Sequence, residues 1–234
     1  MKNDEAPRVA ASGAEKRWTR RKGARPGEII AAALDCFAER GFTATRLDDV
    51  AARAGVTKGT VYLYFQNKED LFKAVVRESL LPLLERAMGE LAVGPEDPRE
   101  RIRRVVTFLV GELLGSRLSV IPKLVFAEAG NFPVIARFYL DEVVVPVRAF
   151  LAGVLREGVD RGQFRPVDPE HAFYSVVAPL LVAALWQNSF GPYEDRTLDG
   201  AAMVRQHLDI ILRGLAPDTP ALGRKARLPC TETH

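Results

Sequence analysis

The chain has 234 residues, of which 47% are hydrophobic and 27% are charged, and its formal net charge is +3. This length allows one or two domains with a substantial apolar core, and the composition is that of an ordinary globular protein. A net charge this small does not by itself indicate that the protein binds nucleic acid.

Positive charge is concentrated at the N-terminus. Between Met1 and Arg25 there are eight lysines and arginines but three acidic residues. We expect residues 1–24 to form a flexible basic arm, which would strengthen DNA binding through phosphate contacts if a DNA-binding unit follows it. A disordered solubilising tail is the alternative, although Trp18 within this basic run favours contact with DNA slightly.

The same region and the cysteines indicate a compartment. The arm lacks the apolar core of a signal peptide, so we expect the protein to stay in the cytoplasm. Cys36 and Cys230 are far apart and form no CxxC pair, which fits two free thiols in a reducing environment.

The first predicted helix begins after Pro26 and Gly27 and ends near Arg40. Its inner face has small and apolar residues at helical spacing, namely Ile30, Ala33, Leu34, Phe37 and Ala38. Gly41 follows at a position suited to a left-handed cap, because glycine adopts positive φ without strain.

Residues 45–65, TRLDDVAARAGVTKGTVYLYF, predict two short helices joined at Gly55. The first has small or apolar residues at the spacing of one helix face: Leu47, Val50, Ala51 and Ala54. Thr45 and Thr57 are placed to cap the two helices with their side-chain oxygens, and Asn67 begins another helix. This is a helix-turn-helix pattern.

The second of these helices would expose hydroxyl groups, a lysine, and a glycine that lets the backbone approach a DNA groove. The predicted DNA contacts are Thr45, Arg46, Thr57, Lys58, Gly59, Thr60, Tyr62, Tyr64 and Lys68. A helical hairpin with ordinary surface residues is the alternative, and spacing alone does not decide between the two.

From Arg25 to about Ser79 the chain resembles the DNA-binding domain of the TetR/AcrR family of bacterial transcription regulators. The matching signature covers residues 29–72, IIAAALDCFAERGFTATRLDDVAARAGVTKGTVYLYFQNKEDLF. We therefore expect a helix-turn-helix domain over residues 25–80 and a larger helical domain over residues 81–216. The resemblance implies a homodimeric repressor that binds a near-palindromic DNA operator and is released by a small-molecule effector.

The remainder of the chain also predicts helices and no sheet, so we expect an all-α fold. The connector from the first domain continues to about Leu91, and Asp97 then caps a helix with Pro98 at its first position. This helix covers residues 99–114, and the other predicted helices cover residues 121–129, 133–161 with a bend at Pro146, a stretch from Asp168 onward, and 198–213. Residues 217–234 are expected to form a flexible tail.

The stretch between Glu170 and Glu194 has no charged residue and is long enough to cross a bilayer. Pro179, Gln187 and Asn188 argue against a membrane span. We expect this helix to be buried in protein, with its own domain on one side and a second copy of the chain on the other.

Aromatic residues are dense in the second domain, where the resemblance implies an effector cavity. Each one is more often a core residue than a ligand contact. The candidate pocket residues are Phe108, Phe126, Phe132, Phe138, Tyr139, Phe150, Tyr174 and Trp186. The candidate polar anchors are Glu128, Asn131, Arg137, Tyr139 and Gln187. Such a pocket would select a lipophilic or aromatic effector.

The resemblance also implies that the uncharged helix and the last helix form a four-helix dimer interface with their copies. The residues expected there are Phe173, Val177, Leu181, Ala184, Leu185, Leu208, Ile211 and Leu212. Two recognition helices held about 34 Å apart, or a multiple of that, would then face successive major grooves.

The sequence shows no enzyme motif. His171, His207 and His234 are the only histidines, and none lies in HExxH or at metal-ligand spacing. GxSxG and nucleotide-binding glycine loops are also missing, so we predict no catalytic residue, no metal and no cofactor. An architectural DNA-binding protein, an adaptor for protein partners and a transcriptional activator remain alternatives to a repressor.

Overall fold

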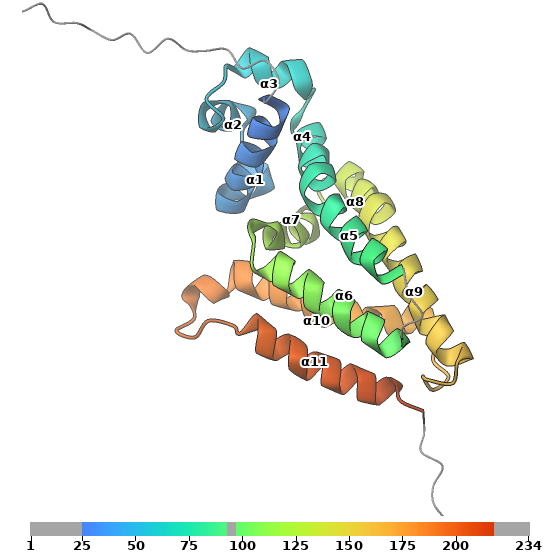
Figure 1. Ribbon diagram of the computed structural model, residues 1–234. Coiled ribbons are helices and arrows are strands. Elements are labelled where there is room, and N and C mark those ends of the chain that lie inside the picture. The colour runs from blue at the N-terminus through green and yellow to red at the C-terminus, as the bar shows by residue number, and fades with distance from the viewer. Residues whose placement is uncertain (1–24, 93–96, 218–234) are drawn as a thin grey trace, which may run out of the picture.

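The computed structural model describes residues 25–92 and 97–217, and every regular element within those ranges is helical (Figure 1). The all-α prediction is therefore confirmed. The basic arm of residues 1–24, residues 218–234 of the predicted tail, and Cys230 with them lie outside the described residues.

Four helices form the upper part of the molecule in Figure 1. They are α1 (Arg25–Ala44), α2 (Leu47–Arg53), α3 (Lys58–Tyr64) and α4 (Lys68–Val75). Gly41 bends α1 with a φ of 79°, and Gly55 turns the chain between α2 and α3 with a φ of 65°. Glycine takes both conformations without the steric cost of a Cβ. The predicted helix-turn-helix is confirmed as α2 and α3.

Four helices begin directly after the residues that the sequence predicts at their starts. A side-chain oxygen of each predicted cap residue accepts a hydrogen bond from a backbone N–H in the next turn, at Thr57, Asn67, Asp97 and Asp168. Each bond satisfies one of the N–H groups that a helix leaves without an internal partner. These starts could be predicted because the cap and its partner are at most three residues apart.

The cap predicted at Thr45 is wrong. Its hydroxyl donates to the carbonyl oxygens of Gly41 and Cys36, at 2.7 and 3.1 Å. The bend at Gly41 interrupts α1 just before this threonine, and the hydroxyl bonds carbonyls around that bend. Arg46 takes the cap position of α2 instead, and its N–H donates to the Asp49 carboxylate at 3.4 Å.

Two long helices lie along one side of the molecule, and each contains a π-helical turn (Figure 1). The first runs through α4, the π turn η1 (Val76–Leu80) and α5 (Leu81–Ala92). The second runs through α8 (Pro133–Tyr139), the π turn η3 (Leu140–Val144) and α9 (Val145–Asp160).

A proline follows each π turn by two residues, at Pro82 and at Pro146. A proline ring clashes with the carbonyl four residues earlier in a regular α-helix, and a wider turn relieves that clash. The irregularity predicted at Pro146 thus takes the form of a wide turn. The two turns face each other, because Arg77 of η1 donates to Glu142 of η3 at 2.8 Å.

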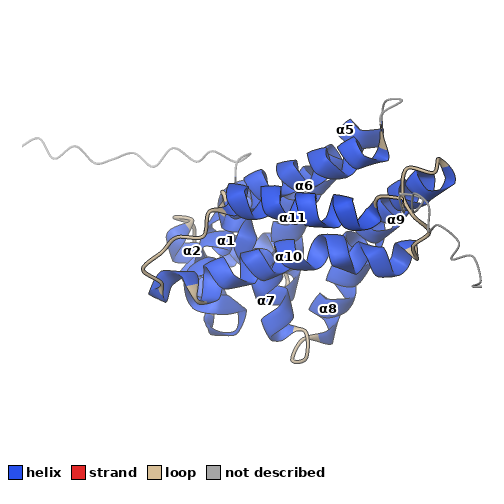
Figure 2. Ribbon diagram, turned by 90° about the horizontal axis from the view of Figure 1, so that it is seen from below, coloured by secondary structure: helices blue, strands red, loops and turns tan. Residues whose placement is uncertain are grey.

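The remaining helices form the lower part of the molecule. They are α6 (Pro98–Leu114), α7 (Val120–Glu128), α10 (Pro169–Ser189) and α11 (Gly200–Leu215), with single turns η2 (Arg117–Ser119) and η4 (Gly191–Tyr193). Figure 2 shows α10 and α11 side by side, and α6 packs behind α11. α7 lies between this layer and α1 (Figure 1).

Buried apolar side chains form two clusters. The first joins α1 to α5 with α7 and α8, and the second joins α6, α9, α10 and α11. Phe42 is central to the first, with ring centroids of Phe37, Phe72 and Phe132 at 5.5, 5.6 and 4.9 Å. Because this cluster continues past residue 80, the predicted domain boundary there stays a prediction.

Within the described residues, α10 is the single helix long and apolar enough to span a membrane by length and composition. It packs against α7, α9 and α11 of the same chain. One side of α10 is therefore buried in its own domain, as expected for the uncharged helix.

Candidate nucleic-acid interface

The surface around α3 is held in place by one buried residue and one cap. Val61 is fully buried and fixes α3 on the first cluster. Thr57 accepts from the Thr60 N–H at 3.3 Å, and the hydroxyl oxygens of these two threonines lie 2.9 Å apart. The other side chains of α3 are consequently presented on an outer face.

Most predicted contact residues of α3 lie on that outer face. Lys58 and Gly59 are exposed, and the side chains of Tyr62 and Tyr64 are 48% and 41% exposed. A Cβ added at Gly59 would meet no neighbour closer than the Thr57 hydroxyl, at 4.0 Å. The fold itself therefore does not require a glycine at this position.

Leu63 is an outer-face residue that the sequence analysis left out of the interface. It is 76% exposed and lies four residues after Gly59, which places both on the same side of the helix. That spacing was the available signal, but an apolar residue on a short helix is normally assigned to the core. An exposed leucine here suits contact with a thymine methyl group.

Lys58 is held against the preceding helix by Asp48. Its ammonium lies 2.8 and 3.0 Å from the two oxygens of that carboxylate, and 5.9 Å from the centre of the Tyr62 ring. The hydrogen bond from Lys58 to Asp48 raises the pKa of the lysine. Both partners are about half exposed, so the carboxylate could be exchanged for a phosphate at little cost.

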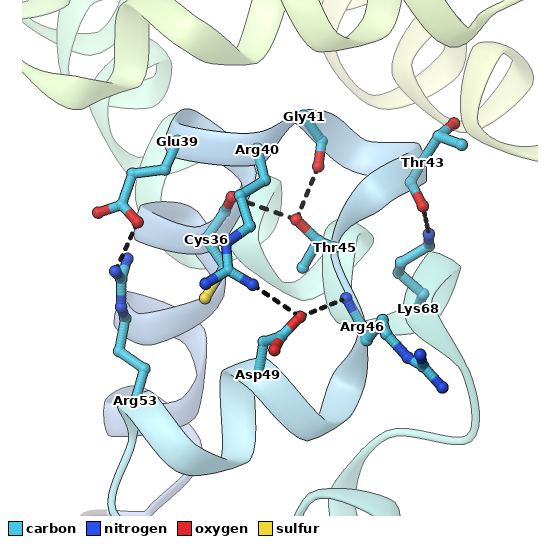
Figure 3. Close-up of polar contacts among 10 residues, drawn as sticks. All are labelled: Cys36, Glu39, Arg40, Gly41, Thr43, Thr45, Arg46, Asp49, Arg53 and Lys68. Atoms are coloured by element: carbon cyan, nitrogen blue, oxygen red, sulfur yellow. Dashed lines mark hydrogen bonds and ion pairs between the residues drawn. The ribbon is translucent and has the colours of Figure 1, made fainter.

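α2 is oriented by polar contacts with α1 (Figure 3). Arg40 lies 2.9 Å from the Asp49 carboxylate, which also accepts from the Arg46 N–H. Arg53 donates to Glu39 at 2.5 Å, and this hydrogen bond lowers the pKa of Glu39. The guanidinium group of Arg46 points away from this network (Figure 3), and its charge acts on Lys58 of α3.

Two predicted contacts have internal partners instead. Thr45 is 2% exposed, and its hydroxyl already bonds carbonyls of α1. Lys68 donates to the carbonyl of Thr43 at 2.9 Å and lies 4.6 Å from the centre of the Phe42 ring. Burial lowers the pKa of Lys68. The Thr45 hydroxyl is therefore used inside the fold, whereas the half-buried Lys68 ammonium directs one of its three N–H donors to Thr43, and its contact with DNA stays a prediction.

The last turn of α1 also contacts the second half of the chain. The Thr43 hydroxyl donates to Glu128 at 2.7 Å, and Asn131 donates to the same carboxylate at 3.3 Å. Burial raises the pKa of Glu128, but these hydrogen bonds and the nearby charge of Lys68 lower it overall. Glu128 and Asn131, predicted as effector anchors, instead link the end of α7 to the helix-turn-helix.

The predicted effector residues do not surround one cavity. A cavity of about 740 Å³ lies between α6, α10 and α11, and Trp186 and the predicted anchor Gln187 line it. The other seven candidates lie elsewhere: Phe108, Phe126, Phe132, Phe138, Tyr139, Phe150 and Tyr174. Five of these pack against the two clusters, and burial raises the pKa of Tyr139. Arg137 is exposed on α8.

The predicted dimer residues are also placed differently. Four of them lie in the core of their own chain, at most 8% exposed: Phe173, Ala184, Leu208 and Leu212. The others are half-buried: Val177, Leu181, Leu185 and Ile211. α10 and its C-cap instead expose what we term the α10 row, which consists of Tyr174, Ala178, Val182, Trp186 and Phe190. Ile210 of α11 is 63% exposed.

Potential metal ligands do not gather in the described part of the chain, where no three His, Cys, Asp or Glu side chains could hold one ion. His171 pairs with the Asp168 carboxylate at 3.0 Å, and His207 bonds the Val176 carbonyl at 3.0 Å. Local structural contacts thus account for both of these histidines.

Comparison with protein families covers both halves of the chain. Residues 29–75 match the model described as bacterial regulatory proteins, tetR family. Residues 100–213 match the model described as AefR-like transcriptional repressor, C-terminal domain. This chain belongs to the TetR family. The resemblance seen in the sequence is confirmed, and the outer face of α3 lies in the TetR helix-turn-helix.

Individual TetR proteins match over most of their length. The HTH-type transcriptional repressor KstR2 of Rhodococcus jostii is 32% identical over 197 residues, covering 83% of this chain and 93% of that protein. The fatty acid metabolism regulator protein of Bacillus subtilis is 30% identical over 139 residues, covering 59% and 70%.

Solved TetR structures share the fold. KstR2 of Mycobacterium tuberculosis, described as a ketosteroid transcriptional regulator, superposes with a TM-score of 0.67 at 25% identity, covering 84% of this chain and 97% of that one. FadR of Bacillus subtilis, solved in complex with stearoyl-CoA, gives a TM-score of 0.65 at 23% identity, with coverage of 81% and 98%.

Proposed function

We propose that this TetR-family protein is a homodimeric repressor that binds a near-palindromic operator through α3 and leaves it when a small lipophilic or aromatic effector binds. The family match and the relatives named as repressors support the general function, which is DNA-binding transcriptional regulation. Operator binding by two subunits, the effector class and action in the cytoplasm are the specific parts of the proposal.

The outer face of α3 carries the proposal. It presents Lys58, Tyr62 and Leu63 around a glycine that the fold does not need. A glycine in that place is useful if another surface comes close to the backbone, as the floor of a DNA groove would. The lysine and tyrosine suit phosphates or base edges, and the leucine suits a thymine methyl.

The α10 row supports a homodimer. Apolar side chains of this size, exposed together on one helix, usually mark an interaction surface. α10 and α11 lie side by side (Figure 2). If a twofold axis passed near the α10 row, α10 and α11 of one subunit would pack against α10 and α11 of the other to form a four-helix interface. Such a dimer could hold two α3 helices about 34 Å apart, facing successive major grooves.

Relatives support the effector class. One is named a fatty acid metabolism regulator, and FadR was solved with stearoyl-CoA, which carries a long apolar chain. KstR2 of Mycobacterium tuberculosis is described as a ketosteroid regulator. These descriptions concern those proteins, and they favour a lipophilic effector for this one.

Selection of bound sequences from a random DNA pool, followed by affinity measurements in a salt series, tests the function. We expect one near-palindromic site bound tightly by two subunits. A Lys58→Ala, Tyr62→Ala variant should bind it at least about a hundredfold more weakly, because two side chains are lost from each subunit and each should contribute about 1–3 kcal/mol to operator binding. Its thermal unfolding should be unchanged because both side chains are exposed. Weak, salt-steep binding without sequence preference would overturn the proposal and favour an architectural role.

Asp48→Asn is expected to strengthen operator binding. The change frees the Lys58 ammonium and removes a negative charge beside the phosphates, so affinity at low salt should rise about three- to tenfold. Fluorescence anisotropy at several salt concentrations measures the effect, which should shrink as salt increases. Glu69→Gln, which removes a carboxylate from α4, is the charge-matched control. Equal effects of the two variants would show that general charge, and not the Lys58–Asp48 pair, is responsible.

A further inference from the structure

The cavity between α6, α10 and α11 is large enough for a drug-sized molecule, at about 740 Å³. Its apolar walls come from Val110 and Leu114 of α6, Trp186 of α10 and Val204 of α11. Gly111 opens it further: a Cβ added there would meet no atom within 4 Å. The room is therefore not filled by neighbouring side chains.

One charged residue lines this cavity, and it is positive. Arg205 of α11 is exposed, and within the described residues it has no ion pair or hydrogen bond through its guanidinium group. No acidic residue is among the lining residues. The other polar groups there are neutral and belong to Thr107, Gln187 and Thr197. A guanidinium group without an acidic partner at the edge of an apolar cavity favours an anionic ligand.

We propose that this cavity binds a molecule that has an apolar ring system and one acidic group, with the acid at Arg205 and the rings against Trp186 and Leu114. The inference rests on the proposed function, since it gives the effector of this TetR protein a site and a charge. Of the aromatic pocket residues predicted from the sequence, this site includes Trp186 alone.

The far wall of the cavity is connected to the DNA-binding helices. Gln187 donates to the carbonyl of Leu114, the last residue of α6, at 2.9 Å. The next residue, Asn188, donates to the Ser119 hydroxyl at 3.0 Å and accepts from Lys123 of α7. α7 packs on α1. A ligand that separates α6 from α10 therefore displaces α7 and the helices above it, which changes the spacing of the two α3 helices.

Two fluorescent probes with the same rings test the site. The first is 8-anilinonaphthalene-1-sulfonate, which is anionic, and the second is N-phenyl-1-naphthylamine, which lacks the sulfonate. Arg205→Gln should weaken binding of the anionic probe about tenfold and leave the neutral probe unchanged. Arg213→Gln, on the same helix but paired with Asp209, should change neither. Gly111→Leu should weaken binding of both probes by about tenfold or more, because the new side chain occupies part of the cavity, and leucine also favours the helix.

The outcomes separate this inference from the proposed function. Operator affinity without probe is measured for every variant and should equal that of the unchanged protein, which shows that the repressor is intact. Anionic probe at a concentration that saturates the unchanged protein should lower its operator affinity, and the effect should be smaller in Gly111→Leu. Probe affinities that Gly111→Leu leaves unchanged, or equal weakening of both probes in Arg205→Gln, would overturn the site. The site would also be overturned if neither probe binds the unchanged protein because side chains of the partner subunit fill the cavity in the dimer. Failure to bind any operator sequence would instead overturn the proposed function.

Discussion

Val182→Glu is expected to convert the dimer into monomers and to reduce operator affinity about a thousandfold or more, because a monomer holds a single half-site. Val182 lies in the middle of the α10 row and is 56% exposed in the isolated chain, so a glutamate there leaves the fold undisturbed. In the proposed dimer, two carboxylates would be buried close together without a partner, which costs several kcal/mol. Sedimentation velocity at micromolar protein measures the assembly.

Val134→Glu provides the matched control. Val134 is 58% exposed on α8, so the same substitution is made at nearly the same exposure but away from the α10 row. This variant should remain dimeric and bind the operator normally. If Val182→Glu also stays dimeric, the twofold axis does not pass near the α10 row.

Phe42→Ala is expected to destabilise the fold by about 3–5 kcal/mol, the usual cost of removing a fully buried phenylalanine. Phe42 is 1% exposed and contacts three other rings and the Lys68 ammonium. Urea unfolding at fixed protein concentration should show a lower midpoint with an unchanged slope. Phe132, which precedes α8, would lose its ring partner, so the helix-turn-helix should also become less firmly attached to the second half of the chain.

Phe126→Ala makes the same chemical change on the surface. Phe126 is 60% exposed on α7, so its removal should alter stability by no more than about 0.5 kcal/mol. Similar destabilisation of both variants would contradict the central role of Phe42 and would place part of the α7 surface in an interface.

Local signals were read correctly from the sequence. The turn at Gly55 and the caps at Thr57 and Asn67 depend on residues within one helical turn of each other, so a short stretch of sequence contains both partners. The buried face of α3 likewise follows from helical spacing around Val61. The exposed face that supports the proposed DNA contacts was therefore largely predictable.

Contacts between residues far apart in the sequence were not predicted. Lys68 is placed by the carbonyl of Thr43 and the ring of Phe42, both in the last turn of α1 beyond the bend at Gly41. The sequence predicted positive φ at Gly41, but it did not reveal that the Thr45 hydroxyl would bond the carbonyls of Gly41 and Cys36 at this bend. A charged or hydroxyl side chain near a helix-turn-helix looks the same in sequence whether it faces DNA or supports the fold from within.

The phase of α10 could not be predicted for a different reason. An amphipathic helix shows its buried side through the period of its polar residues, but this helix is apolar all round. The sequence prediction therefore placed Phe173 and Ala184 in the dimer interface, although both are buried in their own chain. It left out Tyr174 and Val182, which are exposed. Aromatic composition was equally uninformative about the cavity, because rings fill cores as readily as they line pockets.

Each of the two facing π turns holds one residue more than the α-helical turn that it replaces. Deleting that residue would restore regular winding and rotate the helix beyond it only slightly, because the wide turn already accommodates the extra residue. The cost would lie within the turn, where Arg77 donates to Glu142 and lies 4.9 Å from the Phe138 ring. We therefore expect relatives of this chain to tolerate a one-residue difference in length at residues 76–80 or 140–144, with loss of the contact between the two long helices.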